Sequence, residues 1–164
     1  MTIQQELPKK VFQDDFRPGR GNALQAAVAS IFGLELANVP NFVELPEGYE
    51  SAIQSFCCDR DRDRDDRTTT SMVKIKLTTA AAAAAGEEEI EDEDKDEDDH
   101  NHQYGGKLCV LRGKSPRGDF GHVVVARRNK VGDGFEMIHD PHPDETFLDE
   151  SEKFGWCMFF VPTA

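Results

Sequence analysis

Low sequence complexity in the middle of the chain most strongly limits how it can fold. Residues 59–103 contain an Asp/Arg alternation, a run of hydroxyl residues, an alanine run and a block of acids. Such segments bury too little apolar surface to offset the entropy of ordering the backbone. We therefore predict a disordered insertion at 59–103, of which only residues 72–77 alternate like an edge strand. The helical part, residues 1–58, and the sheet part, residues 104–164, then form one domain.

Negative charge is concentrated in the same insertion. Residues 87–99 hold eleven carboxylates and one lysine, which is −10 of the formal net charge of −13, so the rest of the chain carries −3. This acid block would bind calcium or a basic partner, or form a solvated loop. Elsewhere, Lys and Arg do not cluster among aromatic residues, so a nucleic-acid surface is not expected.

The sequence is also not that of a membrane-spanning or disulfide-rich protein. No apolar run reaches the roughly 18–20 residues that span a bilayer, and the first ten residues lack the pattern of a secretory signal. We expect a soluble, cytoplasmic protein with no membrane partner, whose oligomeric state stays open. The cysteines form no C-x-x-C pair and have no His at zinc-finger spacing, so neither a disulfide framework nor a structural zinc is predicted. They are Cys57, Cys58, Cys109 and Cys157, of which the last two lie in apolar runs typical of buried thiols.

Residues 23–32 are predicted to form a helix. Asn22 is a favoured N-cap residue, and Gly33 is the residue favoured just beyond a helix end. Gln25 is the one strongly polar side chain inside this segment, so we expect the helix to be central and largely buried. A second helix is predicted over residues 49–57.

The second half of the chain is predicted to form strands. Short apolar runs alternate with Gly-rich connections, a pattern typical of an antiparallel meander. An early helix packed on such a sheet gives an α+β domain. The expected strands cover residues 107–112, 122–128, 134–140 and 156–161.

A histidine and an aspartate are the first candidates for chemistry. If the turn at 129–133 pairs residue 128 with residue 134, His122 lies directly opposite Asp140, within reach of an imidazole–carboxylate hydrogen bond. That bond would fix the ring and leave its other nitrogen free to exchange a proton with a nucleophile. A slip of one residue would break this pairing. The alternative is an exposed pair at a strand end.

A nucleophile would be expected at the start of the predicted helix. The positive end of the helix dipole favours a thiolate there. The first position after Asn22 holds Ala23 instead.

Three motifs together resemble a known family. The chain reads Gly-Asn-Ala at 21–23, Ser-Pro-Arg-Gly at 115–118 and His-Asp-Pro-His-Pro at 139–143, with His122 between the last two. These segments resemble small proteins of the papain-like cysteine peptidase fold, in which the helix opens with Gly-Asp-Cys or Gly-Asn-Cys. The likeness covers about 90 residues in two blocks. It implies a papain-like α+β fold with the N-terminal helix packed on an antiparallel sheet.

The resemblance also implies roles for the candidate residues. His122 would be the general base, Asp140 its orienting acid, and Ala23 would occupy the position of the nucleophilic cysteine. The parent activity would be hydrolysis or acyl transfer at an amide, peptide or isopeptide bond of a peptide or small amide substrate, without a cofactor. Since alanine has no nucleophilic atom, the chain as written is expected to be inactive. Either the cysteine was replaced deliberately, or the chain is a natural pseudoenzyme. The rival is a non-catalytic binding module that uses the cleft or the acidic insertion.

Further residues complete the predicted site. Gln13, ten residues before the nucleophile position, is the candidate oxyanion donor beside the backbone N–H of Ala23. Arg117 and Lys114 could receive a substrate carboxylate, although a simple turn explains them equally well. The predicted substrate-binding residues are Asn22, Ser115, Arg117 and Trp156.

Two other chemistries are not expected. His139 and His142 flank Asp140 in a pattern that suits metal ligands, but the prolines at 141 and 143 hold an extended run that points successive side chains in different directions, so no metal site is predicted. Cys57 or Cys58 replacing the nucleophile is also disfavoured, because both adjoin the Asp/Arg run.

Overall fold

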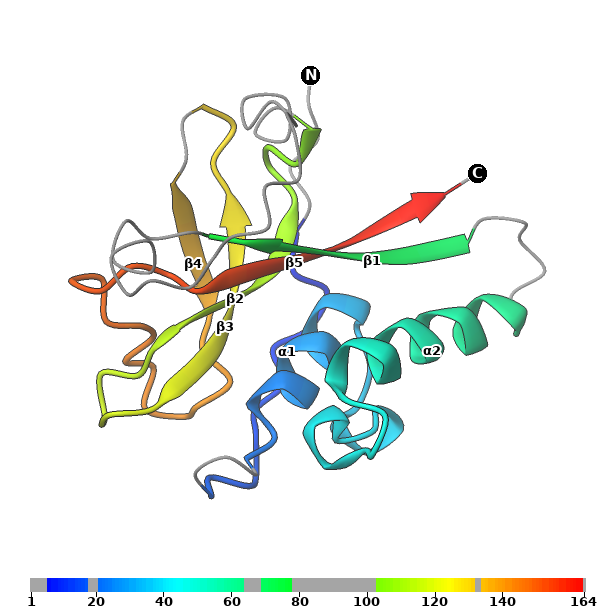
Figure 1. Ribbon diagram of the computed structural model, residues 1–164, viewed down its shortest axis with the longest axis horizontal. Helices are drawn as coiled ribbons and strands as arrows, with labels where there is room; N and C mark the ends of the chain where they lie inside the picture. The colour runs from blue at the N-terminus through cyan, green and yellow to red at the C-terminus, as the bar shows by residue number, and fades with distance from the viewer. Residues whose placement is uncertain (1–5, 18–20, 64–68, 78–102, 132–133, 164) are drawn as a thin grey trace, which may run out of the picture.

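The computed structural model describes residues 6–17, 21–63, 69–77, 103–131 and 134–163. They form an α+β domain in which two α-helices lie on one side of a five-stranded sheet (Figure 1). In chain order the elements are α1 (Ala23–Phe32), η1 (Leu36–Asn38), η2 (Phe42–Glu44), α2 (Tyr49–Arg62), β1 (Thr69–Lys76), β2 (Leu108–Lys114), β3 (Gly121–Arg128), β4 (Phe135–His139) and β5 (Trp156–Thr163).

The sheet is antiparallel throughout, in the order β1-β5-β2-β3-β4. The predicted meander is confirmed for β2, β3 and β4, which pair with their neighbours in sequence. It is wrong for β5, which returns across the sheet to pair with β2 and β1. The long connection at 140–155 allows this return and covers one face of the sheet with Leu148 and Phe154. The short strand predicted at 72–77 is present as β1, at the edge of the sheet.

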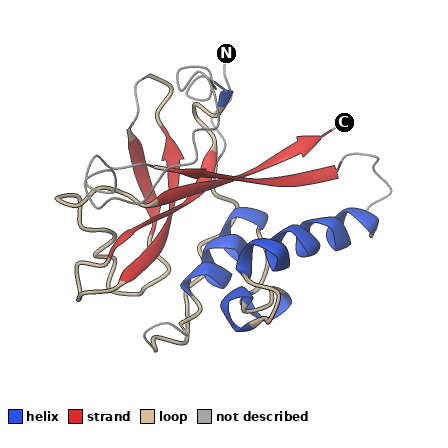
Figure 2. Cartoon of the chain, viewed as in Figure 1, coloured by secondary structure: helices blue, strands red, loops and turns tan. Residues whose placement is uncertain are grey.

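Helix α1 has the predicted bounds and is largely buried. Its alanines and aliphatic residues pack against β2 and β3 in the main core, and Gln25 donates to the backbone oxygens of Leu36 and Val39. Figure 2 shows the helices gathered on this one side of the sheet. Gly33 ends the helix as predicted, with φ of 68° and its N–H bonded to the oxygens of Ala29 and Ser30.

Asn22 stands at the N-cap position, but its side chain does not cap the helix. Its Oδ1 accepts the backbone N–H groups of Asp14 and Asp15 at 3.1 and 2.9 Å, and its Nδ2 donates to the Asp14 carboxylate. The expected cap bond is therefore wrong. The amide side chain instead fixes the segment before the helix against the helix start.

Helix α2 continues into the predicted insertion. It begins at Tyr49, as expected, but runs to Arg62 instead of ending at residue 57. Two of its side chains explain why this polar end is ordered: Asp61 and Gln54 accept the backbone N–H groups of Thr70 and Met72 on β1. The insertion as predicted is therefore too long, because 59–62 and 69–76 belong to regular elements. The alanine run and the acid block lie outside the described residues.

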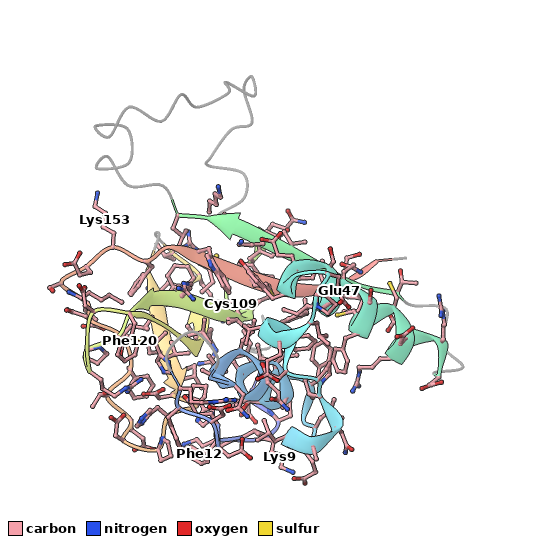
Figure 3. The ribbon with its side chains drawn as sticks, turned by 60° about the horizontal axis from the view of Figure 1, so that its bottom comes forward. Lys9, Phe12, Glu47, Cys109, Phe120 and Lys153 are labelled. Carbon is pink, nitrogen blue, oxygen red and sulfur yellow. The ribbon has the colours of Figure 1, made fainter. Side chains whose placement is uncertain are left out.

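The opposite face of the sheet carries a second core. Cys109 and Cys157 lie within it and are buried, as predicted; Figure 3 labels Cys109 within the fold. Burial raises the pKa of Cys157 to about 11 and raises that of Cys109 well above its ordinary value. Neither thiol is therefore suited to nucleophilic chemistry.

None of the described helices is by itself long and apolar enough to cross a membrane. By length and composition alone, α1 together with residues 36–44 would meet the criterion, although the two segments are bent by 95°.

Candidate active site

The segment before α1 brings Gln13 to the site. Its backbone N–H donates to the oxygen of Pro141, and its Nε2 donates to the oxygen of Asp15 at 2.9 Å. The same Asp15 oxygen accepts the N–H of Asn22, so Asp15 lies beside the residue that precedes α1. This hydrogen bond explains how a residue ten positions before Ala23 can line the same pocket.

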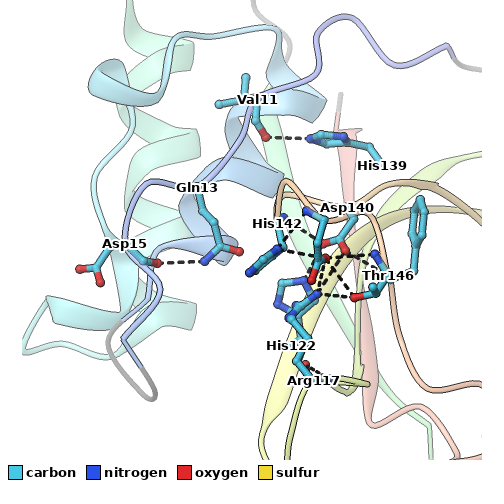
Figure 4. Close-up of polar contacts among 12 residues, drawn as sticks. Val11, Gln13, Asp15, Arg117, His122, His139, Asp140, His142 and Thr146 are labelled. Carbon is cyan, nitrogen blue, oxygen red and sulfur yellow. Dashed lines mark hydrogen bonds and ion pairs between the residues drawn. The ribbon is translucent and has the colours of Figure 1, made fainter.

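The amide of Gln13 is oriented as an acceptor toward the site. Its Nε2 is held by Asp15, and its buried Oε1 has no hydrogen-bond partner among the described residues. Figure 4 shows this oxygen on the side of the amide that faces His142. In this orientation Gln13 offers an oxygen to a ligand, whereas an oxyanion hole requires a donor.

His122 and Asp140 form the predicted hydrogen bond. Nε2 of His122 lies 2.7 Å from Oδ1 of Asp140, and both residues are buried. The register used to predict the bond is wrong, since Arg128 pairs with Phe135 and a bulge at Val125/Ala126 shifts the pairing further. Asp140 therefore follows the last residue of β4, and the turn beyond the strand returns its carboxylate to the ring (Figure 4).

The carboxylate of Asp140 is held by several donors. Oδ1 accepts the backbone N–H of His142 at 2.9 Å as well as the imidazole, and Oδ2 accepts the N–H of Phe147 at 2.8 Å. Burial alone would raise the pKa of Asp140. The hydrogen bonds from His122, His142 and Phe147 outweigh burial, so the pKa is lowered and the group is an anion.

Arg117 lies behind this pair. Its Nη1 donates to Asp144 at 2.8 Å and to the hydroxyl of Thr146 at 2.6 Å, and it lies 3.6 Å from Oδ2 of Asp140 (Figure 4). Because two carboxylates already surround this guanidinium, the structure does not support Arg117 as the receptor of a substrate carboxylate. It positions the loop that carries Asp140.

The two histidines beside Asp140 diverge. His139 is buried, and its Nε2 donates to the backbone oxygen of Val11 at 2.7 Å. His142 turns to the pocket, where its Nδ1 accepts the N–H of Asp144 and its ring meets the edge of Phe16. Within the described part of the chain, no three His, Cys, Asp or Glu side chains are grouped to hold a metal ion.

A pocket of about 540 Å³ lies where the helical part meets the sheet part. Ala23 and Leu24 from the start of α1 line it, together with His122 at the start of β3. Trp156, the predicted substrate-binding residue of β5, also lines it and stacks on Tyr49 with ring centroids 5.8 Å apart. Ala23, as the first helical residue, has a backbone N–H with no partner inside the helix.

Four predicted residues lie away from the pocket wall. Ser115 is buried and accepts the N–H of Arg117, so it shapes the loop; Asn22 is likewise turned to the chain before α1. Lys114 lies 4.0 Å from Glu152. Cys57 is buried in α2 with its pKa raised to about 12 by burial, so it is a poor replacement nucleophile.

The sequence did not identify several residues of the pocket. Arg112 lies in β2 after its apolar residues, and Phe16 and Phe120 lie in loops, where periodicity gives no signal. Only the charged residue that follows the apolar run at 108–111 could have singled out Arg112.

The arrangement can carry out proton transfer beside a helix start. An oriented imidazole, an anionic partner, and position 23 share one pocket, but position 23 has no nucleophilic atom. Comparisons with family models, curated proteins and solved structures give no match for this chain. Its own geometry is therefore the basis for assigning a function.

Proposed function

We propose that this chain has the papain-like fold of a cysteine peptidase or acyltransferase, and that Ala23 occupies the position of the nucleophilic cysteine. The observation that carries the proposal is the buried bond between His122 and Asp140 in a pocket that also contains the first residue of α1. With alanine at position 23, the chain binds a substrate without cleaving it.

The parent reaction follows from the ring nitrogen that stays available. Since Nε2 of His122 is bonded to Asp140, Nδ1 is left to accept the proton of a thiol at position 23. The thiolate then attacks the carbonyl carbon of an amide, with the N–H of residue 23 as an oxyanion donor. The leaving amine takes the proton from the imidazolium, and water or a second amine releases the acyl group from the thioester.

A binding protein is the second candidate, and the substitution at position 23 favours it. The pocket, the oriented His122 and the unpartnered oxygen of Gln13 all persist without a nucleophile. In this case the site holds a ligand, and the imidazole is a hydrogen-bonding group only.

Restoring the thiol tests the catalytic proposal. Cys58 is the exposed cysteine of the described chain, so the test uses Ala23→Cys in a Cys58→Ser background. We expect the new thiol to react with iodoacetamide at pH 7 about 10-fold faster than Cys58 does in the unaltered chain, with a thiol pKa below the ordinary value of about 8.5.

His122→Ala in the same background is the matched control and should remove most of the increase in rate. Mass spectrometry would then locate an acyl adduct on residue 23 after incubation with an activated ester. A thiol at position 23 that titrates at the ordinary value and reacts no faster than Cys58 would contradict the catalytic proposal and favour the binding protein.

A further inference from the structure

The pocket is lined by basic side chains although the chain is strongly acidic. Three arginines and two histidines line it, and none of its lining residues is Asp or Glu in the described part of the chain. The whole sequence carries a formal charge of −13. The lining cations and imidazoles are Arg17, Arg112, Arg117, His122 and His142.

Arg112 differs from the other two arginines in having no acidic partner. Arg17 pairs with Asp15 at 2.5 Å, and Arg117 is held by the carboxylates described above. Among the described residues Arg112 forms no ion pair, and it is exposed near the start of β3. An unneutralised guanidinium in a concave site is a receptor for an anion.

Gly121 determines where this guanidinium lies. A Cβ built on Gly121 would be 2.2 Å from Nη2 of Arg112, so the side chain crosses the backbone at a place that only glycine leaves open. On its other side Arg112 pairs with Trp156 in the sheet register, and Trp156 also lines the pocket. The arginine is therefore positioned at the pocket wall by the chain around it.

We propose that Arg112 binds a carboxylate of an acidic peptide held in this pocket. The proposal deepens the proposed function and rests on it only in taking a peptide as the ligand. A glutamate or aspartate side chain and a C-terminal carboxylate present the same group to the guanidinium, and a planar fork suits either one.

Two further features fit a peptide with an apolar residue next to the acid. The buried Oε1 of Gln13 lacks a donor, and a peptide N–H would supply it. Phe16, Val43 and Phe120 line the pocket and are 52%, 41% and 42% exposed, three of the five large apolar side chains exposed in the described chain. Figure 3 labels Phe120, on the loop between β2 and β3. Clustered apolar surface of this kind marks a binding site.

Binding can be measured on the unaltered chain, because Ala23 prevents turnover. Trp156 is the one tryptophan in the sequence and lies in the pocket, so its fluorescence reports occupancy. The probes are acetylated tetrapeptides with a central Phe-Glu or Phe-Gln pair, each with a free or an amidated C-terminus. We expect the dissociation constant of at least one carboxylate-bearing peptide to be about 10-fold lower than that of the neutral peptide. The free-acid and amidated series show which carboxylate is bound.

Two variants test the residue itself. Arg112→Gln should abolish the preference for the acidic peptide, so that the acidic and the neutral peptide bind with equal dissociation constants. Gly121→Ala should have the same effect while retaining the arginine, because the new methyl group displaces the end of a flexible side chain. Arg62→Gln, an exposed arginine on α2 outside the pocket, is the charge-matched control and should change neither constant.

The outcomes separate this inference from the proposed function. Equal binding of acidic and neutral peptides, or an acid preference that survives Arg112→Gln, overturns the inference whatever the restored thiol does. The inference is also overturned if inorganic phosphate displaces the acidic peptide when phosphate is present at a lower concentration than the peptide. The site would then be a phosphate site. An Arg112-dependent preference together with an unreactive thiol at position 23 supports the inference and contradicts the catalytic proposal alone.

Discussion

At the scale of single residues, Asp140 connects most of the candidate site. Its two oxygens accept hydrogen bonds from the ring of His122 and from backbone N–H groups that follow β4, and Arg117 lies 3.6 Å from Oδ2. Removing the charge therefore affects more than the histidine. Asn in its place keeps an acceptor but turns an amide N–H toward one of these donors.

We expect Asp140→Asn to lower the free energy of unfolding at pH 7 by about 2 kcal/mol, because a buried donor loses its acceptor. Urea denaturation of the two chains measures the difference. Asp119→Asn, at an exposed carboxylate on the loop before β3, is the control and should change the free energy by less than about 0.5 kcal/mol. A similar small change for Asp140→Asn would show that the carboxylate network contributes little to the fold.

The same substitution should alter the pH dependence of stability. The pKa of Asp140 is lower in the folded protein than its ordinary value of 3.8, so its ionisation stabilises the fold above pH 3.8. That contribution is lost as the pH falls through the lowered pKa. Between pH 6 and pH 2 the free energy of unfolding should therefore fall less steeply with decreasing pH for Asp140→Asn than for the unaltered chain. Equal slopes would mean that Asp140 has no lowered pKa.

At the scale of elements, the end of α1 depends on a residue that can adopt positive φ. Gly33 has φ of 68°, and a Cβ there would lie 3.1 Å from the Cβ of Pro8. Gly33→Ala should cost about 1–2 kcal/mol of unfolding free energy. Gly155→Ala is the control, since its Cβ would make only an ordinary contact at 3.9 Å. Thermal denaturation of both variants tests this, and equal melting temperatures would contradict it.

The bulge in the β3–β4 pair shows why the site could be only partly foreseen. The turn chemistry predicted a hairpin and thus a His122–Asp140 contact, and the contact is present. Arg128 pairs with Phe135 and not with residue 134, so the register differs from the predicted one by one residue. The bulge at Val125/Ala126 shifts it by one more residue. Bulges of this kind leave no reliable sequence signal.

At the scale of the whole molecule, residues 11–15 tie the helical part to the sheet part. Val11 donates its N–H to Ser30 of α1 and accepts a hydrogen bond from His139 at the end of β4, while the N–H of Gln13 binds the oxygen of Pro141. One extended segment therefore links α1 to the turn that holds Asp140.

His139→Leu should loosen this link. The buried backbone oxygen of Val11 would lose its shorter hydrogen bond and keep only the hydroxyl of Ser30 at 3.4 Å, so the free energy of unfolding should fall by about 1 kcal/mol. His139→Gln offers an amide N–H at a similar reach and should recover part of the loss. Chemical denaturation compares the two, and equal stability of the Leu variant and the unaltered chain would show that the hydrogen bond is dispensable.

Local signals predicted the elements better than their assembly. The cap residue and Gly33 delimit α1 correctly, and the apolar runs locate four strands within a few residues. The return of β5 to β2, the extension of α2 to Arg62 and the approach of Gln13 depend on contacts between distant segments. No residue pattern within a short window encodes such contacts.

The edge of the sheet at β1 has a consequence for how copies of the molecule meet. The outward N–H groups of Thr70 and Met72 are occupied by side chains of α2, and Lys74 and Lys76 add charge along the same strand. An incoming strand from another copy would have to displace Asp61 and Gln54 before it could extend the ladder. Helix α2 thus protects this edge from intermolecular β-pairing and aggregation.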